Sequence, residues 1–317
     1  MSNSTGILIL AFNRPSLFRE CLDAIAGKID CKIYIHVDGP RKIKKQFDSN
    51  KIQMIKQIID EYENKFTIKT YFQNANLGIR HSVPFAINWV LNENDSIIVV
   101  EDDLIPSVHA LNFCMNSLVL YRENPYIGCV AGYSNSNLDF GKRDDSDVHL
   151  SIFPESYMWA TWRHKWAYYS DTIYLKNSLK KLSKFLDIRD WKFMLIWQIR
   201  AWQARWNIVD TWAYRWVFSL WQQKMFCVIP NHRISVYKGN DEGTHTLGFK
   251  KQNLVTHQFY PIVRMDISTN DYDKSGDLLL ARKIFGMSNL GILLLIGETI
   301  VLMILKVKRQ IHKRLRY

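Results

Sequence analysis

The chain has 317 residues, of which 47% are hydrophobic and 23% charged, with 14 glycines and 8 prolines. This composition excludes disordered, collagen-like and disulfide-framework proteins, and the length suits one large domain or two that share an interface. The net charge is +12, but half of it lies in the last twelve residues, which contain no acid. Because nucleic-acid-binding proteins usually spread basic residues over a folded face, we expect no nucleic-acid partner.

The five cysteines are odd in number and lack the spacing of a zinc site or a complete disulfide set, which favours a reducing cytoplasm. The first apolar run, residues 7–12, has no basic region before it and Asn13-Arg14-Pro15 after it. These flanks are not those of a signal peptide, so we interpret the run as a buried strand.

Strand-like and helical patterns alternate through the first 130 residues. Apolar runs predict strands at 6–12, 31–39, 66–72, 95–103 and 127–134. Helices are predicted from Asn13-Arg14-Pro15 onward, at 49–64, at 80–93 despite Pro84, and at 107–122. This alternation predicts an α/β fold with a mostly parallel sheet and right-handed crossovers.

Polar residues follow each of the first four predicted strands. They are Asn13 and Arg14, then Asp38, then Asn76 and Arg80, and finally Glu101, Asp102 and Asp103. Open α/β sheets bind ligands beyond the carboxyl ends of their strands, where helix N-termini offer unpaired N–H groups to anions. The pattern therefore predicts a nucleotide-type site.

The acidic triplet Glu101-Asp102-Asp103 places like charges together directly after a buried strand. A hard divalent cation offsets the cost of that repulsion, and Mg²⁺ or Mn²⁺ often uses one or two carboxylates together with phosphate oxygens. The alternative is a solvated turn or an N-cap for the helix near Ser107.

Later parts of the chain differ in composition. Ten of the eleven tryptophans lie between Trp159 and Trp221, and an apolar run followed by a basic tail closes the sequence. We expect three segments, at 1–133, at 134–249 and at 250–317, the last being a C-terminal extension.

Several segments, taken together, resemble a known family. They are residues 7–25, HVDGPR, NLGIRHSVPFAI and IIVVEDDLIPS, with PESYMWATWRHKW and PNHRISVYKGNDEGTHT later in the chain. In this order they are similar to GT-A glycosyltransferases, particularly N-acetylglucosaminyltransferase I and bacterial surface-polysaccharide enzymes of the family 2 type. The resemblance covers roughly residues 6–249. It implies a GT-A fold with a nucleotide-sugar-binding half at 1–133 and an acceptor-binding and catalytic half at 134–249. It also implies a metal-dependent, inverting transfer of a sugar from a nucleotide-sugar donor, with a UDP-sugar as the expected donor.

The resemblance also assigns roles to single residues. It implies that Asp103 ligates Mn²⁺ or Mg²⁺, that Asp102 and Glu101 contact the ribose or support the site, and that Asp38 faces the uracil. Ala11, Asn13 and Arg14 would surround the nucleotide, and Arg80 would meet uridine or phosphate. Arg80 suits a diphosphate for a physical reason as well, because a guanidinium on a helix-opening loop can form two parallel hydrogen bonds to a phosphate. The alternative role for Arg80 is a surface salt bridge.

Two further candidates lie later in the chain. His245 stands in a glycine-flanked polar loop, so it could close over a diphosphate or complete the metal shell, the alternative being a simple loop histidine. Asp210 is the candidate general base, although related bacterial sequences carry the acid at the position of Ala213. Several alternatives stay open. Asp210 could supply the base through a shifted alignment, Glu155 could supply it instead, or the chain could have lost the activity. The alternative role of Asp210 is an N-cap for the following helix.

The aromatic residues of the second half are mostly expected in the core, with Trp159 and Trp162 as candidates for acceptor or sugar contact. The apolar run from Leu290 to Leu305 has sixteen residues, fewer than the roughly 20 of a spanning helix. We expect an interfacial helix whose basic tail binds an anionic membrane surface, with a packed terminal helix as the alternative.

The sequence thus predicts a peripheral enzyme on the inner face of the bacterial cytoplasmic membrane, acting on a lipid-linked or polysaccharide acceptor of surface glycan (O-antigen or capsule). A sugar-phosphate nucleotidyltransferase is one rival, although residues 11–16 lack the glycine-rich phosphate loop such enzymes normally need. A non-catalytic membrane-surface binding protein with a degenerate GT-A fold is the other.

Overall fold

The structure, a computed structural model, describes residues 4–134, 148–173, 175–186, 188–239, 269 and 272–314. It contains two compact units. The sheet unit comprises Met1–Ala167 and Phe226–Tyr272, and the helical unit comprises Tyr168–Met225 and Asp273–Tyr317. The boundaries of these units differ from those of the three expected segments. The difference arises because the chain returns to the sheet unit after residue 225.

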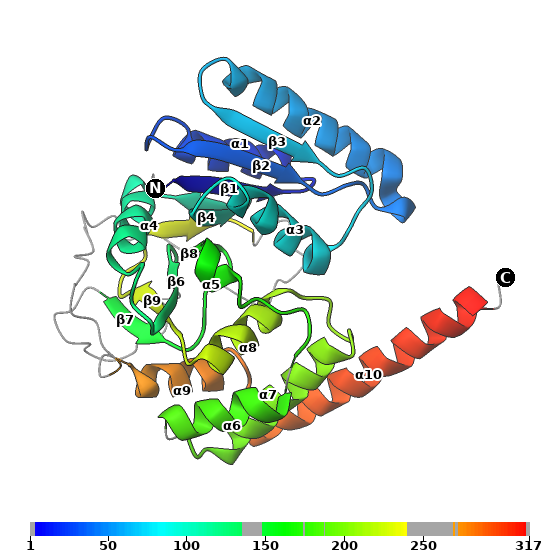
Figure 1. The fold of residues 1–317 in the computed structure, drawn as a ribbon. Helices are drawn as coiled ribbons and strands as arrows, with labels where there is room; N and C mark the ends of the chain where they lie inside the picture. The colour runs from blue at the N-terminus through cyan, green and yellow to red at the C-terminus, as the bar shows by residue number, and fades with distance from the viewer. Residues whose placement is uncertain are drawn as a thin grey trace. The chain divides into compact units, whose positions relative to one another are not determined.

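All strands of the main sheet belong to the sheet unit (Figure 1). Their order is β3-β2-β1-β4-β8-β6-β9-β7. The bounds are β1 Thr5–Ala11, β2 Lys32–Val37, β3 Ile68–Phe72, β4 Ser96–Glu101, β6 Ile127–Ala131, β7 Val148–Ser151, β8 Met158–Trp162 and β9 Phe226–Pro230. A separate two-stranded sheet pairs β5 (Leu104–Pro106) with β10 (Ser235–Tyr237) in antiparallel fashion.

The sheet is mixed, with a parallel half that matches the predicted alternation. The pairs β1·β2, β1·β4, β2·β3 and β6·β9 are parallel, whereas β4·β8, β6·β8 and β7·β9 are antiparallel. The predicted α/β fold is therefore confirmed. The strand at 127–134 also forms, as β6, but the antiparallel strand β8 separates it from β4.

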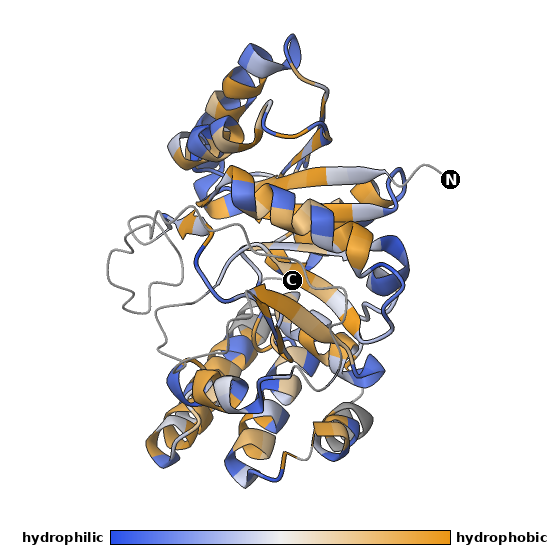
Figure 2. Ribbon diagram, turned by 90° about the vertical axis from the view of Figure 1, so that its left-hand side faces the viewer, coloured by the Kyte–Doolittle hydropathy of each residue, from blue (hydrophilic) through white to orange (hydrophobic). Residues whose placement is uncertain are grey.

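Helices α1 (Pro15–Ile25), α2 (Lys45–Glu63), α3 (Ile79–Leu91), α4 (Val108–Leu120) and α5 (Arg163–Trp166) flank the sheet, and a short 3₁₀ helix η1 spans Lys42–Lys44. Helix α1 packs against α2 and α4, whereas α3 packs against β1 and β4. Helix α3 continues through Pro84, as predicted. Figure 2 shows largely hydrophobic strands, while most helices alternate between hydrophobic and hydrophilic residues.

The strand order reverses direction beside β1. The chain builds β2 and then β3 outward on one side of β1, and β4 then returns to its other side. Leu10 near the end of β1 is in register with His36 of β2 and with Glu101 of β4. Loops on either side of such a reversal diverge, and in open α/β sheets this switch point is where ligands bind.

The helical unit contains α6 (Leu175–Leu186), α7 (Trp191–Arg205), α8 (Ala213–Gln223), α9 (Lys274–Lys283) and α10 (Asn289–Arg314). Trp197 of α7 is its aromatic centre and meets the rings of Phe218, Trp221 and Phe285. The buried guanidinium of Arg215 donates to the backbone oxygens of Thr211 and Ala204 and pairs with Asp171 at 2.7 Å.

Helix α10 is longer than the apolar run that predicts it. It has 26 residues, and Asn289–Lys308 has a mean hydropathy of 2.3, which by length and composition is enough to cross a membrane. The sixteen-residue apolar run alone does not predict a helix of this length, and whether the helix crosses or lies on a membrane stays a prediction. The helix includes Asn289 before the apolar run and the basic residues after Leu305, so it is longer than the run at both ends.

Candidate functional site

One arginine holds the two aspartates at the end of β4. Arg14 places Nη2 2.5 Å from Oδ1 of Asp102 and Nη1 2.5 Å from Oδ2 of Asp103. The backbone N–H of Phe12 donates to Oδ2 of Asp102 at 3.2 Å. Because β1 and β4 are parallel neighbours, their carboxyl ends bring these groups together, as the sequence predicts.

The three acidic groups Glu101, Asp102 and Asp103 outnumber the arginine that pairs with two of them, Arg14. Burial raises the pKa of Asp102 to about 7, although Arg14 opposes the shift. Burial and then the carboxylate of Asp103 raise the pKa of Glu101 well above its usual range. Burial, followed by the charges of Asp103 and Glu101, also raises the pKa of the Tyr237 hydroxyl to about 12. All these shifts favour an additional positive charge at the site.

Asp103 has the properties of a cation ligand. Its Oδ1 atom is buried and has no hydrogen-bond partner among the described residues. A buried carboxylate oxygen without a partner is costly, and a hard cation that prefers oxygen ligands would satisfy it. Within the described ranges no three His, Cys, Asp or Glu side chains form a metal-ligating group. A Mg²⁺ or Mn²⁺ ion at Oδ1 of Asp103 would therefore have to take most of its other ligands from water or phosphate.

Asp38 organises the loop that leads into α3. Its Oδ1 accepts hydrogen bonds from the backbone N–H groups of Gly39 and Leu77, at 2.8 and 2.9 Å. Its Oδ2 accepts from Nδ2 of Asn76 at 2.9 Å and from the N–H of Gly78 at 3.2 Å. Burial raises the pKa of Asp38, and the backbone hydrogen bonds oppose that shift. The carboxylate thus shapes the site mainly by fixing residues 76–78.

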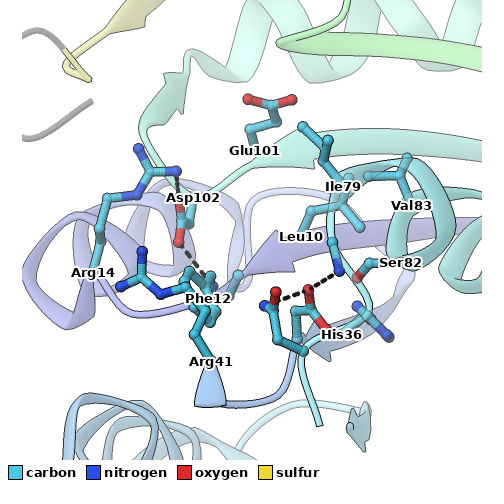
Figure 3. Close-up of a pocket in the computed structure, with 14 residues that line it drawn as sticks. Leu10, Phe12, Arg14, His36, Arg41, Ile79, Ser82, Val83, Glu101 and Asp102 are labelled. Carbon is cyan, nitrogen blue, oxygen red and sulfur yellow. Dashed lines mark hydrogen bonds and ion pairs between the residues drawn. The ribbon is translucent and has the colours of Figure 1, made fainter. Parts of the chain in front are cut away.

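A pocket of about 270 Å³ opens at the switch point (Figure 3). The predicted site residues that line it are Ala11, Arg14, Asp38, Glu101 and Asp102. The other lining residues are Leu10, Phe12, His36, Arg41, Asn76, Gly78, Ile79, Ser82 and Val83. Of these, only Asn76 is among the polar residues that the sequence predicts at the strand ends. Asn13 and Asp103 are absent from the lining, although Arg14 connects Asp103 to it.

The spacing of three lining residues carries a signal that sequence reasoning could have used. Ile79, Ser82 and Val83 lie at i, i+3 and i+4 in the first turns of α3, and that face is directed into the pocket. Arg80 follows Ile79 but is not among the lining residues. His36 of β2 is in register with Leu10 of β1. Burial lowers the pKa of the His36 imidazole to about 4, so the ring is neutral at pH 7.

Arg41 is fixed at the pocket by a buried carboxylate. Asp48 on α2 accepts from Nε and Nη2 of Arg41, both at 2.8 Å, and from Nδ2 of Asn13 at 2.9 Å. The guanidinium of Arg41 also lies 5.1 Å from the ring centroid of Phe12. Asn13 therefore supports this cluster through Asp48. The sequence offers HVDGPR as a motif but gives no sign that Asp48 orients its arginine.

A segment from the second half reaches the acidic triplet. The backbone N–H of Lys238 donates to the carbonyl oxygen of Asp103 at 2.8 Å, directly after β10. At Gly239 a Cβ atom would collide with the hydroxyl of Tyr237 and with Oδ2 of Asp103, so a larger residue here would force these groups to move. His245, six residues further along, lies outside the described residues.

The two tryptophans predicted to contact a sugar are core residues. Trp159 and Trp162 are 0% and 1% exposed, on β8 in the middle of the sheet. The indole N–H of Trp162 donates to the carbonyl oxygen of Leu118 at 2.8 Å, and the ring of Trp159 packs 5.8 Å from that of Trp166. Their burial does not support acceptor contact, because a sugar needs an exposed ring face.

The candidate bases lie in different units. Asp210 is exposed and lies in the helical unit, just before α8. The first residue of α8 is Ala213, and the hydroxyl of Thr211 accepts from its N–H at 3.2 Å. The N-cap residue of α8 is Trp212, so Asp210 does not have the N-cap role. Glu155 lies in the sheet unit, half-buried, before β8.

No protein-family model and no curated protein matches this chain. Similar solved structures include S. aureus TarS 1–349 (11% identity, TM-score 0.43) and GalNAc-T7 with UDP, GalNAc and Mn²⁺ (9%, 0.46). A third is 4-diphosphocytidyl-2C-methyl-D-erythritol synthase from Anaerococcus prevotii (14%, 0.37). The matches cover 75%, 74% and 73% of this chain and 61%, 43% and 90% of the others. Likeness at this level carries no argument about activity.

Proposed function

We propose that this chain is a metal-dependent, inverting glycosyltransferase of the GT-A type that uses a nucleotide-sugar, with UDP as the expected nucleotide. The observation that carries the proposal is the pocket at the β1/β4 switch point, which adjoins two buried aspartates that pair with Arg14. A nucleoside diphosphate needs an enclosed pocket for its base and a position where its anionic oxygens can coordinate a cation together with the protein. The resemblance of residues 7–25 and 97–107 to GT-A enzymes supports the same conclusion.

The pocket is suited to the nucleoside part of the donor. Its volume of about 270 Å³ is slightly below the roughly 300–1,000 Å³ of typical small-molecule sites, so it would hold the base and ribose and leave the sugar outside. Phe12, Ile79 and Val83 offer apolar walls, and Asn76, Ser82 and Arg41 offer polar groups. Ala11 contributes a small side chain at the end of β1.

Asp103 would hold a divalent cation, with Asp102 supporting it. When bound, such an ion stabilises the negative charge that develops on the departing diphosphate. Arg14 lies against both aspartates and is therefore placed to contact the same diphosphate with its guanidinium. His245 and Arg80 remain candidates for further diphosphate contacts.

Inverting transfer needs a carboxylate that accepts the proton of the attacking acceptor hydroxyl. We assign this role to Asp210, whose carboxylate is exposed. Glu155 is the alternative base. The acceptor we propose is a lipid-linked or polysaccharide glycan of the bacterial surface, modified in the cytoplasm at the inner face of the membrane.

The proposal is tested by incubating the purified chain with UDP-, GDP-, CMP- and dTDP-sugars, Mn²⁺ and a lipid-linked acceptor pool. We expect release of the nucleotide product from one donor, dependent on acceptor and abolished by EDTA. A nucleotidyltransferase would instead release pyrophosphate from a nucleoside triphosphate and a sugar phosphate. Absence of release from every donor would contradict the glycosyltransferase function.

A further inference from the structure

One face of α10 is apolar and exposed along the length of the helix. Counting 100° per residue, its exposed apolar side chains occupy a continuous arc of about 200°. The basic end of the helix adjoins this arc, since Lys306 and Lys308 follow the apolar stretch. The exposed apolar residues are Leu290, Leu293, Leu294, Ile296, Ile300, Val301, Met303, Ile304, Leu305, Val307 and Ile311.

The opposite face of α10 packs within the helical unit. Ile292, Leu295 and Thr299 are buried on this side. The hydroxyl of Thr299 accepts a hydrogen bond from Nε2 of Gln203 on α7 at 2.8 Å, with both side chains buried. Glu298 lies 4.0 Å from Arg200 of α7. These contacts hold α10 against α7 through its middle turns.

The contact with α7 continues to the basic end of the helix. Lys306 donates from its ammonium group to the carbonyl oxygen of Trp206, the residue that follows α7. Polar contacts to α7 and its end therefore extend from Glu298 to Lys306, two turns of α10. Helix α10 is thus part of a two-helix layer and cannot enter a bilayer alone while these contacts persist.

A spanning arrangement would place charged groups of α7 in the hydrocarbon. Lys192, Arg200 and Arg205 belong to α7, and charged side chains are costly at membrane depth. A helix that lies in the plane of the surface avoids this cost, because only its exposed arc enters the lipid and its packed face stays with the protein. Trp191 and Trp206, at either end of α7, are exposed aromatic residues of the kind enriched at membrane interfaces.

We propose that α10 docks the protein on an anionic membrane surface, lying in the plane of the bilayer on its exposed apolar arc, and does not cross it. The choice of an anionic surface rests on charge. The last twelve residues carry Lys306, Lys308, Arg309, Lys313, Arg314 and Arg316 and no acid. Such a segment is attracted to negatively charged headgroups, and the apolar arc provides the insertion. This inference does not depend on the proposed glycosyl transfer.

Vesicle flotation tests the partner. The full chain is mixed with vesicles of phosphatidylcholine alone or with 30% phosphatidylglycerol, and we expect at least tenfold more protein to float with the anionic vesicles. Leu294→Asp combined with Val301→Asp should abolish this binding. Ile43→Asp, the same change at a highly exposed residue of the sheet unit, should leave it intact. Failure of the unaltered chain to bind anionic vesicles would overturn the proposal.

The alternative occupants and orientations give different results. If the arc covers a second copy of the chain, gel filtration without lipid will give a dimer that Leu294→Asp disrupts, and vesicle binding will be absent.

Nitroxide labels at positions 290, 297, 301 and 304, introduced with Cys31→Ser, report depth by accessibility to oxygen and to a nickel chelate. Shallow, similar depths support the in-plane helix, whereas a maximum at the bilayer centre would show crossing and contradict it.

Discussion

Arg14 lies with its Nη1 atom 2.5 Å from Oδ2 of Asp103, and the other terminal nitrogen of the same guanidinium reaches Asp102. This single cation prevents the two buried aspartates from repelling each other. It leaves Oδ1 of Asp103 without a hydrogen-bond partner among the described residues. The relationship between Arg14 and Asp103 therefore describes a buried acidic cluster, which we propose as the site of a divalent cation.

Gly239→Ala, a change in the second half of the chain, should weaken the proposed cation site at Asp103. The added methyl group would collide with Oδ2 of Asp103 and the hydroxyl of Tyr237, so the carboxylate must move. We expect at least a tenfold loss of Mn²⁺ affinity and a fall of about 1–3 kcal/mol in the free energy of unfolding, measured by calorimetry and urea denaturation.

Gly297→Ala is the matched control. A Cβ atom at position 297 meets nothing within 4 Å, and the residue lies inside α10, where alanine stabilises a helix by about 0.5–1 kcal/mol relative to glycine. This variant should keep the Mn²⁺ affinity of the unaltered chain. Equal affinities in both glycine variants would contradict the close approach of Gly239 to the carboxylate.

Asp48→Asn should release Arg41 and Asn13 and lower stability by about 1–3 kcal/mol at pH 7. Hydrogen bonding from Arg41 is the first cause that lowers the pKa of Asp48, to about 2. A carboxyl group whose pKa is lower in the folded state stabilises the protein above its unfolded pKa, and this contribution disappears as the pH falls toward the folded value. The stability difference from the unaltered chain should therefore be full above about pH 4 and shrink toward pH 2.

Urea unfolding at pH 7, 5, 4 and 3 measures this difference. The exposed Asp60 lies on the same helix, so Asp60→Asn controls for a lost charge on α2 and should change stability by less than about 0.5 kcal/mol. A pH-independent difference for Asp48→Asn would mean that the carboxylate does not act through its charge on Arg41.

Asp210→Asn should reduce sugar transfer by roughly 10²-fold or more while nucleotide binding stays intact, as expected when a general base is lost. Glu155→Gln, which removes the rival carboxylate in the sheet unit, should transfer at a nearly normal rate. Steady-state rates with the donor found in the nucleotide-sugar screen measure both variants. The reverse pattern would assign the base to Glu155.

The local signals of the sequence predicted the parallel half of the sheet well. Consecutive apolar residues such as Ile97–Val100 predict a strand buried on both faces, and all four are fully buried in β4. Because parallel strands end at one edge, Arg14, Asp38 and Asp102 could be placed together before any geometry was known. The antiparallel insertion of β8 between β4 and β6 depends on long-range pairing that no local pattern encodes.

The parts of the site that could not be predicted depend on partners in other elements of the chain. Asp38 has donors from residues 76–78, and Asp48 binds Arg41 from the next element, so both carboxylates act through their neighbours. Trp159 and Trp162 are candidates for sugar contact from the sequence because an indole ring can stack on a sugar. Their place on a central strand instead buries both rings.

The central claim is that Asp103 binds a divalent cation that the nucleotide diphosphate shares. Calorimetric titration of UDP into the chain, with and without Mn²⁺, tests it most directly when repeated on Asp103→Asn and on the control Asp60→Asn. We predict that UDP binding requires Mn²⁺ in the unaltered chain and in Asp60→Asn, and that Asp103→Asn loses it. The same affinity for UDP with Mn²⁺ in all three proteins would contradict the claim.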